Sequence, residues 1–215
     1  MGARLVLFDV DGTLVKGSSS ERGFTGWLFR HGRLGPRQWL ATLLFIVVYL
    51  PRFRRDIFKK NKAYLTGLDV EEVAAFASRY VRENLIERLH APSLARLRRH
   101  LAEGDEVVLL TGTPDFIAEP LAAHLGVRSF VASVCPRGDG RFAFGPPIEH
   151  PFGAAKLGYA EDLARTRNVP LQETIACADS RDDLPLLHTV GAPVAVRPDA
   201  RLRQEAVAKG WEIIE

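Results

Sequence analysis

Short apolar runs that end in polar residues recur along the chain. The first covers residues 4–8 and is followed by Asp9 and Asp11, a second ends at Thr111, and a third ends at Asp179. Apolar runs of this length, rich in Val, Leu and Ile and bounded by turn residues, are typical of buried strands in a parallel sheet. Ligands bind beyond the carboxyl ends of such strands. The pattern therefore predicts an α/β fold with polar residues gathered at one edge of a sheet.

Between these runs the apolar residues follow a helical period. Helices are predicted from about residue 20, over 69–89 with Asp69 as the cap, over 92–101, and over 116–125 before Gly126. Strands at 129–134 and 141–144 around the Gly-Asp-Gly turn at 138–140 predict a hairpin. The end of the chain, residues 192–214, predicts strand, helix and strand.

Asp9 and Asp11 are the first candidates for chemistry. Two residues apart on an extended chain, their side chains lie on the same side. Two close carboxylates are tolerated when a cation lies between them or one holds a proton, which favours a hard oxygen-ligand site. A turn rich in Asp and Gly is the structural alternative. A calcium-binding EF-hand loop is excluded, because no Glu stands at the twelfth position counted from either aspartate.

The sequence Phe-Asp-Val-Asp-Gly-Thr-Leu at 8–14 resembles the first motif of the haloacid dehalogenase superfamily of phosphotransferases. The resemblance implies that Asp9 attacks phosphorus and becomes an aspartyl-phosphate. It also implies that Asp11 protonates the leaving alcohol and then deprotonates the hydrolytic water. A carboxylate can serve as a covalent nucleophile, and a nearby acid with a raised pKa can serve as general acid and base.

Later segments resemble the other motifs of this superfamily in the same order. Thr111 and Gly112 correspond to the second motif, with the threonine hydroxyl and the amides around the glycine expected to bind phosphate oxygens. Lys156 corresponds to the third motif, whose lysine neutralises the nucleophile and the phosphate. Asp179 and Asp183 match the Asp-x-x-x-Asp of the fourth.

The fourth motif implies a magnesium site. The expected ligands are the carboxylates of Asp9 and Asp179 and the main-chain oxygen of Asp11, while Asp183 holds a metal-bound water or Lys156. Magnesium binds phosphate together with few carboxylates and keeps several waters, so this ligand set suits it. Asp182 is an alternative to Asp183, and the spacing favours Asp183.

The resemblance extends to the phosphoserine-phosphatase-like branch. It implies a doubly wound parallel sheet, formed by residues 1–15 and 92–215, and an inserted helical cap, residues 16–91. Phosphoserine phosphatases of this branch have a Glu seven residues after the second aspartate of the first motif, where this chain has Ser18. We therefore expect a magnesium-dependent hydrolase of another small phosphorylated metabolite. A binding module for a phospho-ligand or a membrane surface, and a phosphotransferase, are the alternatives.

The predicted cap contains an apolar run, residues 39–50, followed by a basic run, residues 52–62, with six basic residues and one acid. The apolar run is too short to span a bilayer, so we expect a helix buried in the cap. A wall of a substrate channel and a face on a membrane surface are the alternatives. For the basic run, an interfacial amphipathic segment and a solvated helix face remain equal alternatives.

Composition adds few constraints. The formal net charge of +3 is too small to indicate a nucleic-acid partner. Cys135 and Cys177 lie far apart without a CxxC pair, so reduced, buried thiols are expected. With no basic and apolar leader before the first strand, the prediction is a cytoplasmic protein. Asp139 and His150 are expected to be turn and surface residues without a chemical role.

Overall fold

The computed structural model describes residues 3–215, so the first two residues of the predicted core segment 1–15 lie outside the described residues. Six strands form one parallel sheet in the order β3-β2-β1-β6-β7-β8. Their bounds are Leu5–Phe8 for β1, Glu106–Pro114 for β2, Ser129–Ser133 for β3, Ile175–Ala178 for β6, Ala192–Val196 for β7 and Glu212–Ile214 for β8. The predicted α/β class is therefore confirmed.

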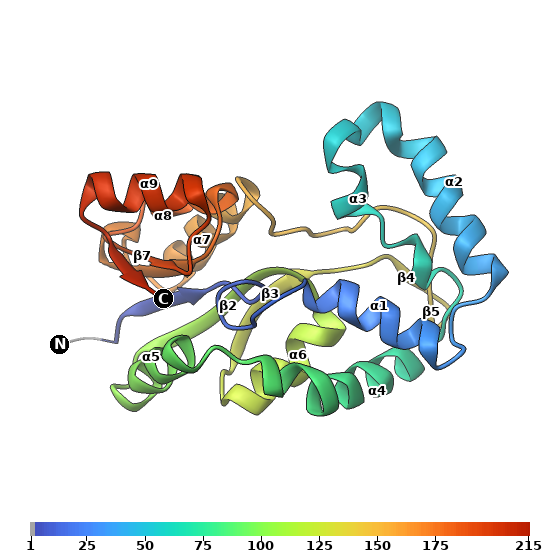
Figure 1. Ribbon diagram of the computed structural model, residues 1–215, viewed down its shortest axis with the longest axis horizontal. Coiled ribbons are helices and arrows are strands. Elements are labelled where there is room, and N and C mark those ends of the chain that lie inside the picture. Colours follow the sequence, from blue (N-terminus) through green and yellow to red (C-terminus); the bar gives the residue numbers. More distant parts are fainter. Residues whose placement is uncertain (1–2) are drawn as a thin grey trace.

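Helices cover both faces of this sheet (Figure 1). Val6 and Phe8 of β1 belong to one hydrophobic cluster, and Leu5 and Leu7 belong to the other. The first cluster includes α1 (Ser20–Arg30), α4 (Val70–Tyr80), α5 (Ala91–Ala102) and α6 (Asp115–Leu125). The second includes α7 (Ala155–Thr166), α8 (Leu184–Leu187) and α9 (Ala200–Lys209). A central strand buried on both faces explains its continuous apolar sequence, and the arrangement is the predicted doubly wound one.

The segment between β1 and α5 is helical, as predicted. Asp69 caps α4 by accepting a hydrogen bond from the amide of Glu72 at 3.1 Å. The predicted helix over 69–89 is shorter than expected, because α4 ends at Tyr80 and continues as a π-helical turn, Val81–Leu85, and a 3-10 turn, Ile86–Arg88. Two further 3-10 turns, Arg54–Asp56 and Ala63–Leu65, lie on either side of α3.

The helix α2 (Pro36–Phe53) and the short α3 (Ile57–Lys60) project from the rest of the molecule (Figure 1). They have a small hydrophobic cluster of their own, centred on Phe45 and Ile57. The expectation that residues 39–50 are buried is wrong, since Leu40 is 67% and Val47 68% exposed. The helix packs through the side that carries Ala41 and Phe45, while large apolar residues on its other side stay exposed. No helix within residues 3–215 is long and apolar enough to cross a membrane.

The predicted hairpin is correct at its turn and wrong in its strands. The turn at Asp139 and Gly140, both with positive φ, joins β4 (Arg137–Gly138) to β5 (Arg141–Phe142). Residues 129–133 instead form β3, which pairs in parallel with β2. The helix α6 carries the chain from the end of β2 back to the end of the sheet where β2 begins. Residues 129–133 therefore run parallel to β2 and form the edge strand of a β-α-β unit. The predicted strand, helix and strand at the end of the chain are β7, α9 and β8.

Candidate active site

The two motif aspartates follow β1 at the carboxyl end of the sheet. The amide of Asp9 still donates to the carbonyl of Cys177 in β6, at 3.0 Å, so the sheet fixes the backbone there. Asp11 comes after the strand, and its carboxylate accepts hydrogen bonds from the amide of Ser20 at 2.8 Å and from the hydroxyl of Thr113 at 3.2 Å. The start of α1 and the end of β2 therefore orient the Asp11 side chain.

Gly12 lets the chain turn between these aspartates and Asp179. Its φ of +88° lies in the left-handed region, which favours glycine. A Cβ atom at this position would also clash with the carboxylate of Asp179. The glycine of the first motif therefore permits the close approach of the loops after β1 and β6.

The structure brings Lys156 into the same place. Its side chain is buried, and Nζ lies 2.9 Å from Oδ1 of Asp9 and 2.9 Å from Oδ1 of Asp183. Burial alone would lower the pKa of this lysine, but the two carboxylates raise it above its ordinary value. Lys156 is therefore a fixed positive charge beside Asp9.

Three carboxylates, those of Asp9, Asp179 and Asp183, offer oxygen atoms that all lie within 4.8 Å of one another. Burial and repulsion from Asp9 and Asp183 raise the pKa of Asp179 to about 8. Burial raises the pKa of Asp183 to about 6, although Lys156 acts in the opposite direction. One lysine does not balance three carboxylates, so the group has the charge and the donor atoms to hold a divalent cation.

Thr111 lies at the same edge, but its hydroxyl is already engaged. It donates to the hydroxyl of Thr113 at 3.1 Å, and it accepts from the Thr113 amide, also at 3.1 Å. Gly112 lies against the ring of Phe152, where a Cβ atom would approach to 2.9 Å. Sequence reasoning missed Thr113, which connects the second motif to Asp11. Thr113 lies two residues after Thr111 on the same strand, so the two side chains lie on the same side, and this spacing could have identified Thr113 from the sequence.

A cavity of about 750 Å³ opens over these residues. Its floor is formed by the motif residues Asp9, Asp11, Thr111, Gly112, Lys156, Asp179 and Asp183, and its opposite wall by residues of α1 and of the segment around α3, including Glu21, Thr25, Phe58, Asn61, Lys62 and Tyr64. All the predicted site residues therefore line one cavity.

An ion pair between Glu21 and Lys62 dominates the opposite wall. Both side chains are largely buried, and the hydroxyl of Tyr64 donates to the Glu21 carboxylate at 3.1 Å. Sequence reasoning missed all three residues, because 41 positions separate the two charges. Glu21 comes three positions after Ser18, the position at which phosphoserine phosphatases of this branch have a Glu. A carboxylate is therefore present close to that position in the sequence.

His150 was expected at the surface, and the structure corrects this. Its ring lines the cavity, lies 2.8 Å from the hydroxyl of Ser133 and stacks on Phe152 with 5.6 Å between ring centroids. Burial, together with the charges of Lys62, Lys60 and Lys59, lowers the pKa of His150 to about 4. The imidazole is therefore neutral near pH 7. Asp139 lies in a turn, as expected.

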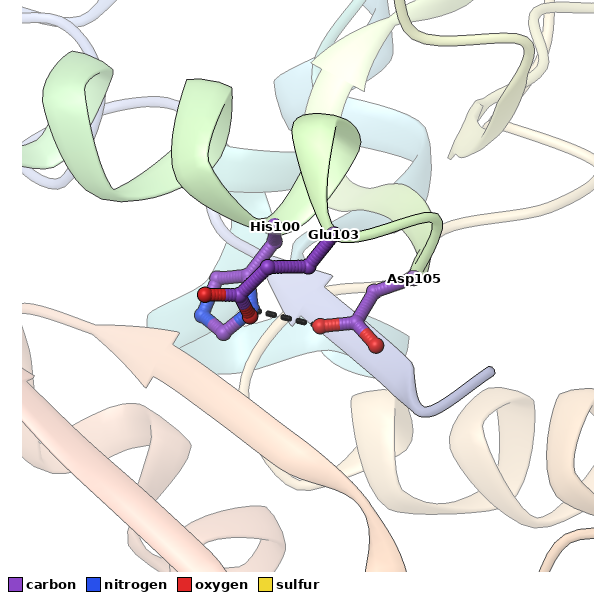
Figure 2. A group of neighbouring side chains, drawn as sticks. All are labelled: His100, Glu103 and Asp105. Carbon is purple, nitrogen blue, oxygen red and sulfur yellow. Dashed lines mark hydrogen bonds and ion pairs between the residues drawn. The ribbon is translucent and has the colours of Figure 1, made fainter. Parts of the chain in front are cut away.

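A second group of potential metal ligands, His100, Glu103 and Asp105, lies where β2 begins, at the opposite end of the sheet (Figure 2). Here two arginines already pair with the two carboxylates: Arg4 with both, and Arg99 with Glu103. Nη2 of Arg4 lies 2.6 Å from Glu103 and 2.7 Å from Asp105, and Nδ1 of His100 lies 2.7 Å from Asp105. These contacts join the starts of β1 and β2, which is a structural role.

Comparison with known proteins identifies the family. The profile of haloacid dehalogenase-like hydrolases matches residues 6–188. The chain belongs to this family. A phosphoserine phosphatase of Mycobacterium tuberculosis is 32% identical, over 96% of this chain and 68% of its own length. A histidinol-phosphatase of Neisseria meningitidis is 28% identical, over 98% of this chain and 97% of its own length.

Solved structures agree with the family assignment. A Bordetella pertussis protein of unknown function superposes with a TM-score of 0.84 at 27% identity, covering 100% of this chain and 99% of that one. A phosphoserine phosphatase in complex with its substrate superposes with a TM-score of 0.66 at 18% identity, covering 100% and 94% of the two chains, which shows a shared fold. The predicted membership of this superfamily, its phosphoserine-phosphatase-like branch and a phosphatase activity are confirmed.

Proposed function

We propose that this phosphatase is a magnesium-dependent phosphomonoester hydrolase that acts on a small phosphorylated metabolite through an aspartyl-phosphate on Asp9. The observation that carries the proposal is the pairing of two different carboxyl groups at the cavity floor. Nζ of Lys156 lies 2.9 Å from the Asp9 carboxyl group and places a positive charge beside it. Burial raises the pKa of Asp11, with repulsion from Asp9 acting in the same direction and the hydrogen bonds from Ser20 opposing it.

This difference divides the chemistry between the two side chains. A carboxylate oxygen of Asp9 attacks phosphorus, the bond from phosphorus to the ester oxygen breaks, and Asp11 gives its proton to the departing alkoxide. In the second step a water attacks the aspartyl-phosphate and Asp11 takes a proton from that water. Phosphate leaves and the Asp9 carboxylate is restored, so both groups return to their initial states.

Asp9 and Asp179 are the side chains proposed to hold magnesium, with the main-chain oxygen of Asp11 as a third protein ligand. The crowding of three carboxylates and the raised pKa of Asp179 support this set. When bound, the ion would neutralise phosphate oxygens and help to orient the ester. Asp183 remains as the partner that positions Lys156, at 2.9 Å from its Nζ.

The cavity wall favours a polar leaving group. Glu21, Lys62 and Tyr64 face the motif residues across the cavity, so a leaving group with charged or hydrogen-bonding substituents would find partners there. The names of the relatives, phosphoserine phosphatase and histidinol-phosphatase, describe phosphate esters of this kind. We take residues 16–91 as the cap that selects the leaving group, and a cytoplasmic location remains a prediction.

A rapid-quench experiment with a labelled phosphomonoester tests the covalent mechanism. In the Asp11→Asn variant, label should be trapped on the protein, because hydrolysis of the phosphoenzyme loses its general base. In the Asp9→Asn variant no label should be trapped. Trapping on Asp9→Asn equal to that on Asp11→Asn would contradict the assignment of Asp9 as nucleophile.

A further inference from the structure

One side of α2 presents an unusually large apolar surface to solvent. We define the α2 face as the residues on this side that are between 48% and 68% exposed: Trp39, Leu40, Leu43, Leu44, Val47, Val48 and Leu50. No charged residue interrupts the sequence between Trp39 and Leu50. Contiguous apolar surfaces of this kind mark sites of interaction with a protein or a membrane.

The α2 face points away from the body of the protein. The opposite side of the helix carries Ala41 and Phe45, which are buried against Ile57 of α3 and Ala63. Figure 1 shows the helix at the outer margin of the molecule, beyond α3. A flat or convex partner can therefore reach the α2 face without displacing any described element.

The charges around the α2 face have one sign. Residues 30–62 contain nine Lys or Arg residues and a single acid, Asp56. Three of the nine form ion pairs: Arg33 with Glu72, Lys59 with Asp182 and Lys62 with Glu21. By contrast, Arg37, Arg52 and Arg54, near the two ends of α2, are exposed and form no ion pair with any residue that the structure describes. The apolar surface thus lies between uncompensated positive charges.

This combination distinguishes between the two partners that an apolar helix face can have. In a two-fold symmetric contact with a second copy, the face brings arginines of one chain near arginines of the other, and residues 30–62 offer only Asp56 to balance them. An anionic bilayer matches both properties, because its acyl region accepts apolar side chains and its headgroups attract arginine. We propose that the α2 face docks this protein on an anionic membrane surface.

In this docking the helix lies in the interface plane and does not span the bilayer. Trp39 lies at the beginning of the face, and its ring contacts Phe29, itself 57% exposed, with 6.0 Å between ring centroids. Aromatic side chains of this kind favour the headgroup level of a bilayer. The proposal does not depend on the phosphatase mechanism, since no residue of the α2 face lines the cavity.

Co-sedimentation of the full chain with vesicles tests the proposal. The vesicles are phosphatidylcholine alone and phosphatidylcholine mixed with phosphatidylglycerol, at low and at high salt. The unaltered protein should bind the mixed vesicles, and binding should weaken at high salt and on phosphatidylcholine alone. The double variant Leu43→Glu with Val47→Glu should abolish binding, and Arg52→Gln with Arg54→Gln should weaken it roughly thirtyfold.

Two matched variants control for nonspecific effects. Val207→Glu, at a side chain on α9 that is 68% exposed, adds one charge and is matched to the single variant Val47→Glu, and Arg98→Gln with Arg128→Gln removes two exposed arginines elsewhere. Both should bind as the unaltered protein does. Thermal melting shows whether each variant is folded. Fluorescence of Trp39 should shift to the blue on mixed vesicles, and Trp39→Tyr should remove this shift.

The proposal is overturned if the unaltered protein stays in the supernatant with mixed vesicles, or if Val207→Glu lowers binding as much as the α2 variants do. Sedimentation velocity tests the rival partner, a second copy of this chain. A dimer that Val47→Glu separates into monomers, without any vesicle binding, would assign the α2 face to a second copy of this chain.

Discussion

Two groups of acidic side chains lie at opposite ends of the same sheet, and they differ in how their charge is balanced. At the carboxyl end, one lysine serves three carboxylates, and the pKa values of Asp179 and Asp183 are raised to about 8 and about 6. At the other end, hydrogen bonds from Arg4 and His100 outweigh burial and lower the pKa of Asp105 to about 2. Uncompensated charge marks the group that can bind a cation, and compensated charge marks the one that stabilises the fold.

The largest expected effect is on catalysis. Asp9→Asn should lower hydrolysis of a soluble phosphomonoester by at least about 10³-fold, because it removes the nucleophile with little change in volume. Asp105→Asn is the matched change at the other group, and it should keep the turnover rate. Steady-state assays of both variants, on protein that melts cooperatively, decide the matter. Equal losses would remove the functional distinction between the two groups.

Metal binding should separate the groups next. Asp179→Asn should weaken binding of Mn²⁺, used as a paramagnetic substitute for magnesium, by about 100-fold. Glu103→Gln should leave the affinity unchanged, because Arg4 already occupies its carboxylate. Electron paramagnetic resonance titration measures free Mn²⁺ without substrate, so the result is independent of activity. If Glu103→Gln weakened binding as well, the ion would have to be assigned to both groups.

Folding stability should depend on the group at Asp105, which is expected to have no role in catalysis or metal binding. Asp105→Asn should lower the free energy of unfolding by about 2 kcal/mol, because the Asp105 carboxylate accepts charge-assisted hydrogen bonds from Arg4 and His100 in a buried position. Urea denaturation measures the change. As a control, Asp162→Asn breaks the exposed pair with Arg165 and should have no measurable effect. A loss no greater than that of the control would show that the Arg4 pairing adds nothing.

The smallest effect is the pH dependence of that stability. The pKa of an Asp in the unfolded chain is about 3.9, and the pKa of Asp105 in the folded protein is about 2. Between these two pH values the unfolded state therefore binds more protons than the folded state does. The stabilisation by Asp105 is therefore complete above about pH 4 and is lost as the pH falls toward 2. The difference in unfolding free energy between the unaltered protein and Asp105→Asn should shrink as the pH falls from about 4 to about 2. A constant difference would mean that the carboxylate charge is irrelevant.

Much of the fold followed from local pattern. The apolar run before Asp9 predicted the central strand, Asp69 predicted the start of α4, and Gly126 predicted the end of α6, where its φ is +73°. Errors arose where long-range pairing decided. Residues 129–133 pair with β2, and the following turn closes a different, shorter hairpin. The same local sequence suited both pairings, because a strand does not specify its partner.

The exposed α2 face illustrates a similar limit. An apolar helix of this length is equally compatible with a buried and an interfacial position, since its composition does not reveal how many neighbours surround it. In the structure α2 is buried only on the side around Phe45. The expected burial failed because the segment has too few other apolar residues to cover a helix on all sides.

The sequence by itself determined which residues lie at the carboxyl edge of the sheet: the alternation of strand side chains pairs Asp9 with Asp11, and the order of the motifs adds Thr111, Lys156 and Asp179. Tertiary structure alone decided the rest of the site. It joined Glu21 to Lys62 in one wall of the cavity and placed His150 in the cavity lining. At the other end of the sheet it gave Asp105 an arginine 101 positions away. Local spacing fixes the direction of a side chain, whereas charge balance and burial depend on contacts between distant segments, which only the folded chain brings together.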